Sequence, residues 1–108
     1  MMRKFKKARD IQGTRFIHAY ASCPTGWRVP SDQTVAIARL AVQTNLFPLY
    51  EVENGTQYIL NYRGNRSVSD YLAVQGRFKH LKETDIASIQ EMVNHDWQLL
   101  NANIERVF

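Results

Sequence analysis

The stretch that decides the fold is Phe16-Ile17-His18-Ala19-Tyr20-Ala21-Ser22-Cys23-Pro24-Thr25-Gly26-Trp27, where an apolar run opens into a proline–glycine turn. The run Thr14 to Ala21 is mostly apolar, which predicts a strand buried on both faces. Because such a strand is typical of a parallel sheet covered by helices, the sequence predicts an α/β fold. Cys23, the only cysteine, follows this strand directly. A thiol at a strand end suits a metal or cluster ligand, but one thiol needs further ligands from elsewhere.

Two helices are expected on either side of this strand. The N-terminal one should bury Phe5 and Ala8 and leave a solvated basic face of Arg3, Lys4, Lys6, Lys7 and Arg9. The second opens at Pro30, with Ser31 as its capping residue and Asp32 in its first turn. It should be largely buried through Val35, Ile37, Ala38, Leu40, Ala41 and Val42. Asn45 is expected to end it in the left-handed conformation.

A hairpin and two further helices complete the predicted element order. Asn54-Gly55 favours a two-residue turn, which would pair Glu51 with Tyr58 and give the hairpin an apolar face. That face would be led by Tyr50, Val52 and Ile59. Val68 to Val74 is expected to form a short helix with Tyr71, Leu72 and Val74 turned inward. From Asp85 to about Arg106 one apolar stripe predicts a long amphipathic helix, consisting of Ile86, Ile89, Val93, Trp97, Leu100, Ile104 and Val107.

Composition restricts the function classes. At 108 residues, 44% hydrophobic and 22% charged, the chain is expected to form one domain over residues 1–108. No segment approaches the roughly 20 apolar residues of a membrane span, and no signal sequence is evident, so a cytoplasmic protein is expected. The net charge of +4 comes largely from the first nine residues. A small basic nucleic-acid-binding module is therefore an alternative, although its aromatic residues are expected to be buried.

No side-chain arrangement predicts nucleophilic catalysis, and no catalytic residue is assigned. His18 is expected in the core, while His80 and His95 are expected at the surface. Trp27 is expected to pack in the core, where it would also shield a cofactor from water. A basic run is interpreted as a solvated surface or as a surface that steers an acidic partner, and it contains Arg77, Lys79, His80 and Lys82.

Several motifs in order resemble one protein family. They are Phe16 to Trp27, Arg28 to Thr34, Leu40 to Val42, Phe47 to Gly55, Tyr71-Leu72 with Gln75 to Phe78, and Asp85-Ile86 with Ile89-Gln90. From about Lys6 to Leu100, the chain resembles the C-terminal portion of the thiamine-diphosphate-binding β subunit of 2-oxoacid:ferredoxin oxidoreductases, the pyruvate synthase group. The resemblance implies a C-terminal fragment of a thiamine-diphosphate-binding-type domain. It departs from the family at Ser22, where proline is common, and at Asn45, where glycine is common.

The resemblance implies that Cys23 is the fourth thiolate ligand of a [4Fe–4S] cluster whose other ligands lie outside this chain. It implies thiamine diphosphate and Mg²⁺ in the parent enzyme, which converts pyruvate, coenzyme A and oxidised ferredoxin to acetyl-coenzyme A, carbon dioxide and reduced ferredoxin. Partners would be the α, γ and δ subunits and ferredoxin, with no nucleic acid and no membrane. Ser22 would add a hydrogen bond near the sulfur.

Two other interpretations remain open at this stage. Free cysteine is among the most buried residue types, so Cys23 is alternatively an inert buried thiol. The chain is alternatively a non-catalytic interaction domain whose long last helix docks a partner. On the main interpretation the isolated chain, with one thiol, is expected to be inactive and to carry no cofactor of its own.

Overall fold

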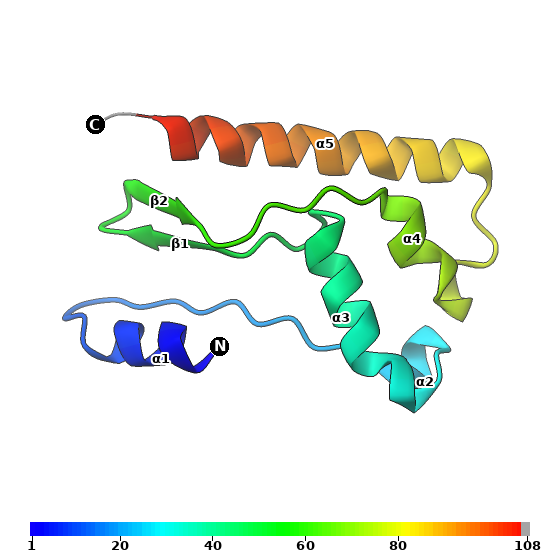
Figure 1. Ribbon diagram of the computed structural model, residues 1–108, viewed down its shortest axis with the longest axis horizontal. Helices are drawn as coiled ribbons and strands as arrows, with labels where there is room; N and C mark the ends of the chain where they lie inside the picture. The colour runs from blue at the N-terminus through cyan, green and yellow to red at the C-terminus, as the bar shows by residue number, and fades with distance from the viewer. Residues whose placement is uncertain (107–108) are drawn as a thin grey trace.

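The computed structural model describes residues 1–106 as an elongated body of about 45 × 29 × 20 Å (Figure 1). The long helix α5 runs along one side, a hairpin and α4 lie beneath it, and α3 crosses towards α2. The elements are α1 (Met2–Arg9), α2 (Pro24–Trp27), the 3₁₀ turn η1 (Ser31–Gln33), α3 (Thr34–Gln43), β1 (Tyr50–Glu53), β2 (Gln57–Leu60), α4 (Val68–Ala73), the 3₁₀ turn η2 (Gly76–Phe78) and α5 (Glu83–Glu105). This combination of helices and a hairpin agrees with the α/β class.

The core lies where α3, α4 and α5 meet. Its buried residues are Val29, Ile37, Ala41, Val68, Tyr71, Leu72 and Val93. The radius of gyration is 15.8 Å, whereas a compact domain of this length has a radius of about 13 Å. The chain therefore covers its own apolar surface less completely than a compact domain does.

The segment Thr14 to Ala21 is not the buried strand that the sequence predicts. It is an extended segment without regular secondary structure, and almost all of it is exposed; Phe16 is 87% exposed. Within the described residues the only sheet is the two-stranded one formed by β1 and β2, so no neighbour pairs with this segment. The apolar pattern reports a tendency to be buried, whereas a strand also needs a partner for its backbone groups.

The hairpin forms at the predicted turn, but its register differs by one residue from the prediction. Asn54 and Gly55 both have positive φ, as expected. Thr56 adds a third residue to the loop, so Glu51 pairs with Ile59 rather than with Tyr58. A shift of one residue reverses the faces of a strand. Consequently Ile59 lies opposite Glu51, on the other face from Tyr50 and Val52, and its place in the predicted apolar face is wrong. Tyr50 and Val52 pair with Leu60 and Tyr58 instead, and both are exposed.

Helix α3 differs from the prediction at its start and agrees with it at its end. Ser31 lies in the 3₁₀ turn that precedes the helix, and its predicted capping hydrogen bond is absent. At the other end Asn45 adopts φ of 62°, as predicted. Its side-chain amide donates to the Gly64 carbonyl oxygen (3.0 Å) and accepts from the Gly64 N–H (2.9 Å). Only one face of the helix is buried, since Val35 is 64% exposed.

The two later helices agree with the sequence. In α4, Tyr71 and Leu72 are buried as predicted, whereas Val74 lies just past the helix and is exposed. Helix α5 spans 23 residues, about 34 Å, and buries the apolar stripe against α4 and β2. Val107, also predicted for this stripe, lies outside the described residues. None of the helices formed by residues 1–106 is long and apolar enough to cross a membrane.

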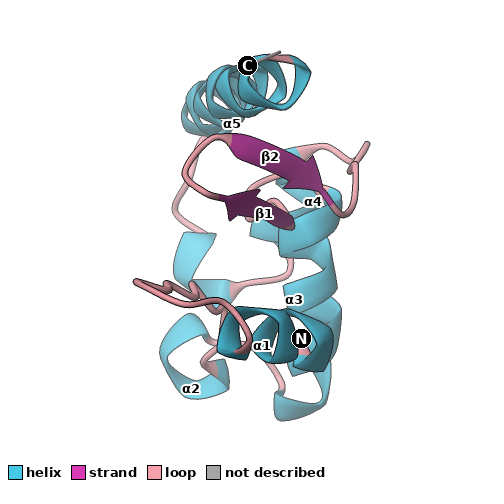
Figure 2. Cartoon of the chain, turned by 90° about the vertical axis from the view of Figure 1, so that its left-hand side faces the viewer, coloured by secondary structure: helices cyan, strands magenta, loops and turns pink. Residues whose placement is uncertain are grey.

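The basic helix α1 lies apart from the hairpin in Figure 2 and is linked to it by long side chains. Lys7 forms ion pairs with Glu51 (3.2 Å) and Glu53, and the Lys4 ammonium donates to the Tyr50 carbonyl oxygen. The two carboxylates raise the pKa of Lys7, chiefly through its hydrogen bond to Glu53 and then through that to Glu51. The predicted solvated face is therefore wrong in part, because the hairpin carboxylates neutralise some of its charge.

Candidate functional site

Cys23 lies at the end of the exposed extended segment, where the chain enters α2. It occupies the position before the first turn of that helix, and its carbonyl oxygen accepts from the Trp27 N–H (2.9 Å). Its side chain is exposed. The alternative of an inert thiol buried in the core is wrong for this structure, because the sulfur is accessible to a second molecule.

The residues on either side of the sulfur leave room around it. A Cβ placed on Gly26 would lie 3.3 Å from the Cys23 sulfur, so the glycine keeps that side open. The Ser22 hydroxyl donates to the Thr34 carbonyl oxygen (3.1 Å). Since this proton is already used, the expected hydrogen bond from Ser22 towards the sulfur is not formed.

Trp27 anchors the loop that carries the thiol. Its ring packs edge-on against Tyr20 (centroids 5.7 Å apart), and the Arg77 guanidinium lies 3.9 Å from its centroid. Arg77 also donates to Gln75 Oε1 (2.8 Å) and to the Tyr71 hydroxyl (3.3 Å). The predicted packing role of Trp27 is confirmed. The contacts with Arg77 tie α2 to a segment about fifty residues later in the chain.

A hydrogen bond between two tyrosine hydroxyls adds to the contacts that Trp27 and Arg77 make. Tyr20 and Tyr71 share a hydrogen bond of 2.8 Å. Burial raises the pKa of Tyr20 well above its usual range, and the hydrogen bond to Tyr71 raises it further. Tyr20 therefore stays protonated at neutral pH and serves to hold the end of the extended segment against α4.

The histidines do not gather around the thiol. His18 is exposed rather than in the core, with its ring packed edge-on against Phe47 (5.0 Å). His80 and His95 are at the surface, as predicted. Throughout the described part of the chain, no three histidine, cysteine, aspartate or glutamate side chains lie close enough to hold a metal ion. Any metal centre at Cys23 therefore needs ligands from another polypeptide segment.

The predicted basic run divides into two parts. Arg77 is half-buried in the aromatic cluster, whereas Lys79, His80 and Lys82 are exposed. A pocket of about 390 Å³ opens between α2 and η2, lined by Gly26, Arg28, Gly76, Arg77, Lys79 and His80. Arg28 was not predicted to belong to this surface, because the pocket joins residues about fifty positions apart.

Comparison with known proteins finds close relatives. The chain is 47% identical over 103 residues to the ketoisovalerate oxidoreductase subunit VorB of Pyrococcus abyssi, covering 92% of this chain and 33% of that protein. It is 44% identical over 101 residues to the pyruvate synthase subunit PorB of Methanocaldococcus jannaschii, covering 92% and 34%. It is also 44% identical over 112 residues to PorB of Methanosarcina barkeri, covering 97% and 37%. No protein-family model matches the chain.

The chain is homologous to a portion of an oxidoreductase β subunit. It spans about a third of the length of the curated relatives it matches. The resemblance inferred from the motifs between Phe16 and Gln90 is thereby confirmed. The relatives are named for two different 2-oxoacids, ketoisovalerate and pyruvate, so the similarity supports the class of oxidoreductase rather than one substrate.

Proposed function

We propose that this chain is the C-terminal part, a single domain, of the β subunit of a 2-oxoacid:ferredoxin oxidoreductase. The observation that carries the proposal is 44–47% identity to such subunits over 92% of the chain. The proposed enzyme oxidises pyruvate or a related 2-oxoacid with coenzyme A and reduces ferredoxin. Its other partners are the α, γ and δ subunits. On the basis of the proposed activity, we infer that the enzyme is cytoplasmic.

Within that enzyme, Cys23 supplies one ligand to a [4Fe–4S] cluster. A cluster of this type takes four thiolates, and the exposed sulfur beside Gly26 is suited to be one of them. The remaining three come from outside this chain. When bound, the cluster supplies one-electron redox chemistry. Thiamine diphosphate and Mg²⁺ are likewise held by the rest of the subunit.

This chain's own contribution is to hold the thiol in place. The extended segment ends at Tyr20, which is fixed to Tyr71, and α2 is fixed through Trp27 and Arg77. Cys23 lies between these two anchors. The large ring of Trp27 next to the loop also limits the access of water, which tunes the environment of a bound group.

Anaerobic reconstitution tests the proposal. The chain is combined with the remaining part of the subunit, iron and sulfide, and the visible absorption of an iron–sulfur cluster is measured. We expect Cys23→Ser to weaken or abolish that absorption. Thr25→Ala, an exposed change two residues away that keeps the thiol, serves as the matched control. An unchanged cluster in Cys23→Ser excludes the ligand role.

A further inference from the structure

The pocket between α2 and η2 is strongly cationic. Arg28, Arg77 and Lys79 line it together with His80, and no carboxylate does. None of the ion pairs between residues 1–106 involves these three cations, whereas Lys7 and Arg66 elsewhere are paired with carboxylates. The pocket is therefore a local excess of positive charge in a concave surface, which favours an anion.

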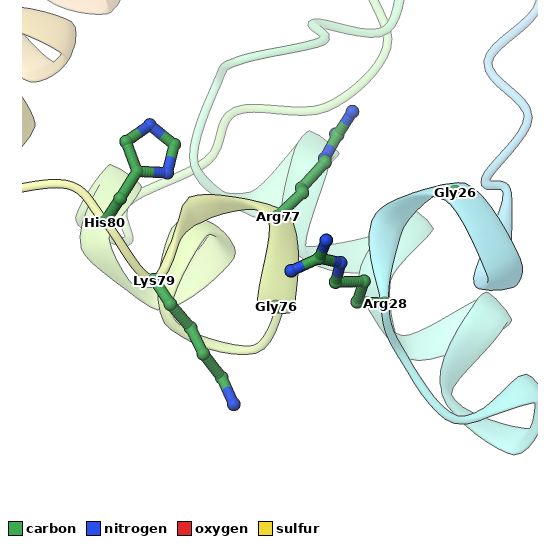
Figure 3. Close-up of a pocket in the computed structure, with 6 residues that line it drawn as sticks. All are labelled: Gly26, Arg28, Gly76, Arg77, Lys79 and His80. Carbon is green, nitrogen blue, oxygen red and sulfur yellow. The ribbon is translucent and has the colours of Figure 1, made fainter.

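The two walls of the pocket are held together by a close backbone contact. The Gly76 N–H donates to the Arg28 carbonyl oxygen (3.1 Å). A Cβ on Gly76 would lie 2.6 Å from the Arg28 Cβ, so only glycine permits this approach. Figure 3 shows the Arg28 side chain reaching from the end of α2 towards the turn that carries Gly76 and Arg77. The position of Arg28 in the pocket is thus fixed by the fold.

Arg28 has a backbone conformation that is unfavourable for its residue type. Its φ and ψ are both 56°, in the left-handed region, where glycine or asparagine is usual. Strained conformations of this kind persist chiefly at functional positions. Arg77 is also held in advance, by Trp27, Gln75 and Tyr71. The Arg77 guanidinium therefore loses little entropy when a ligand arrives, whereas the exposed Arg28 side chain makes no hydrogen bond within residues 1–106 and keeps its donors for a ligand.

We propose that this pocket binds a phosphate group. The volume of about 390 Å³ is within the range of small-molecule sites. Guanidinium groups recognise phosphate oxygens through paired charge-assisted hydrogen bonds, and a third cation matches a doubly charged anion. In Figure 3 the Arg77 and Lys79 side chains point in opposite directions, and the Arg77 guanidinium already lies on Trp27 and donates to Gln75 and Tyr71. Arg28 is therefore the residue that donates to the anion, and Arg77 and Lys79 add positive charge around it. Free phosphate and a phosphate ester share this chemistry.

Titration of the full chain with phosphate, followed by NMR of its backbone amides, tests the proposal. We expect saturable shifts confined to residues 26–28 and 76–80. Arg28→Gly keeps the left-handed backbone and removes the guanidinium, so it should weaken binding by about tenfold or more. Lys79→Gln should weaken binding by only about two- to threefold. Lys6→Gln, on α1 and outside the pocket, removes the same charge and should leave binding unchanged.

Three ligands separate the possible sources. Inorganic phosphate and phenyl phosphate distinguish a free ion from an ester, and saturation by either one supports the site. An oligoglutamate peptide that saturates at lower concentration than both would overturn it in favour of protein docking. Equal losses in Arg28→Gly and Lys6→Gln would also overturn it, because the attraction would then be diffuse. Binding of phosphate in this pocket involves only residues of this chain and does not depend on the cluster role of Cys23.

Discussion

Replacing Arg28 and Asn45 separately by glycine should change stability in opposite directions, although both residues have positive φ, 56° and 62°. A left-handed residue other than glycine costs roughly 1–2 kcal/mol. Glycine removes that cost but loses about 0.5–1 kcal/mol through its larger entropy in the unfolded chain. Arg28 is exposed and makes no side-chain hydrogen bond within residues 1–106. Arg28→Gly should therefore raise the free energy of unfolding by about 0.5–1 kcal/mol.

The same backbone gain is outweighed at Asn45. Its amide makes two hydrogen bonds to Gly64 in a half-buried site, each contributing about 1 kcal/mol. Asparagine also tolerates the left-handed region better than arginine, so the gain from glycine is smaller. Asn45→Gly should consequently lower the free energy of unfolding by about 1–2 kcal/mol.

Urea unfolding followed by circular dichroism measures both variants against the unchanged chain. The midpoint should rise for Arg28→Gly and fall for Asn45→Gly at similar slopes. A fall of similar size in both variants would refute the reasoning, because it would mean that the Arg28 side chain stabilises the fold. Asn45→Ala should be less stable than Asn45→Gly, since it loses the same hydrogen bonds and keeps the backbone strain.

Two further substitutions test the contacts around the candidate site. Gly76→Ala should lower the free energy of unfolding by about 2–4 kcal/mol through overpacking and the loss of one backbone hydrogen bond. Gly26→Ala is the control in the same urea experiment, because its Cβ would meet only the Cys23 sulfur, at 3.3 Å. Because burial raises the pKa of Tyr20 in the folded chain, stability should be full below the unfolded pKa of about 10 and fall as the pH rises above it. Tyr20→Phe should flatten this fall above about pH 10, and an equally steep fall in that variant would assign it to another group.

Features that depend on neighbouring residues were predictable from the sequence. Apolar residues that recur every three or four positions over a long stretch predict α5. The sequence also predicts the left-handed conformation at Asn45 and at Asn54-Gly55 correctly. These signals act within a few residues, where sterics decide the conformation. The hairpin register was not predictable from the sequence. The choice between a two-residue and a three-residue loop depends on Thr56, which has no strong turn preference.

Features that depend on distant residues were not predictable. The exposure of Phe16 follows from the lack of a neighbouring strand within residues 1–106, and the apolar pattern alone does not report that. The contact of Gly76 with Arg28 joins positions 48 apart, so the cationic pocket has no local signature. Cys23 differs in this respect, since its motif was recognisable and its exposure in the structure agrees with a ligand role.

The exposure of Phe16 and that of Cys23 have a common cause under the proposed function. Cys23 follows Phe16 by seven positions of extended chain, roughly 23 Å. Both residues are exposed within the described part of the chain. A polypeptide that pairs with the extended segment would bury Phe16 and bring further thiolates towards Cys23 at the same time. Burial of a phenylalanine contributes about 1.5–3 kcal/mol. Hydrophobic contact along this segment would then hold the sulfur in position before any iron–sulfur bond forms, so assembly of the subunit and completion of the ligand set would be coupled.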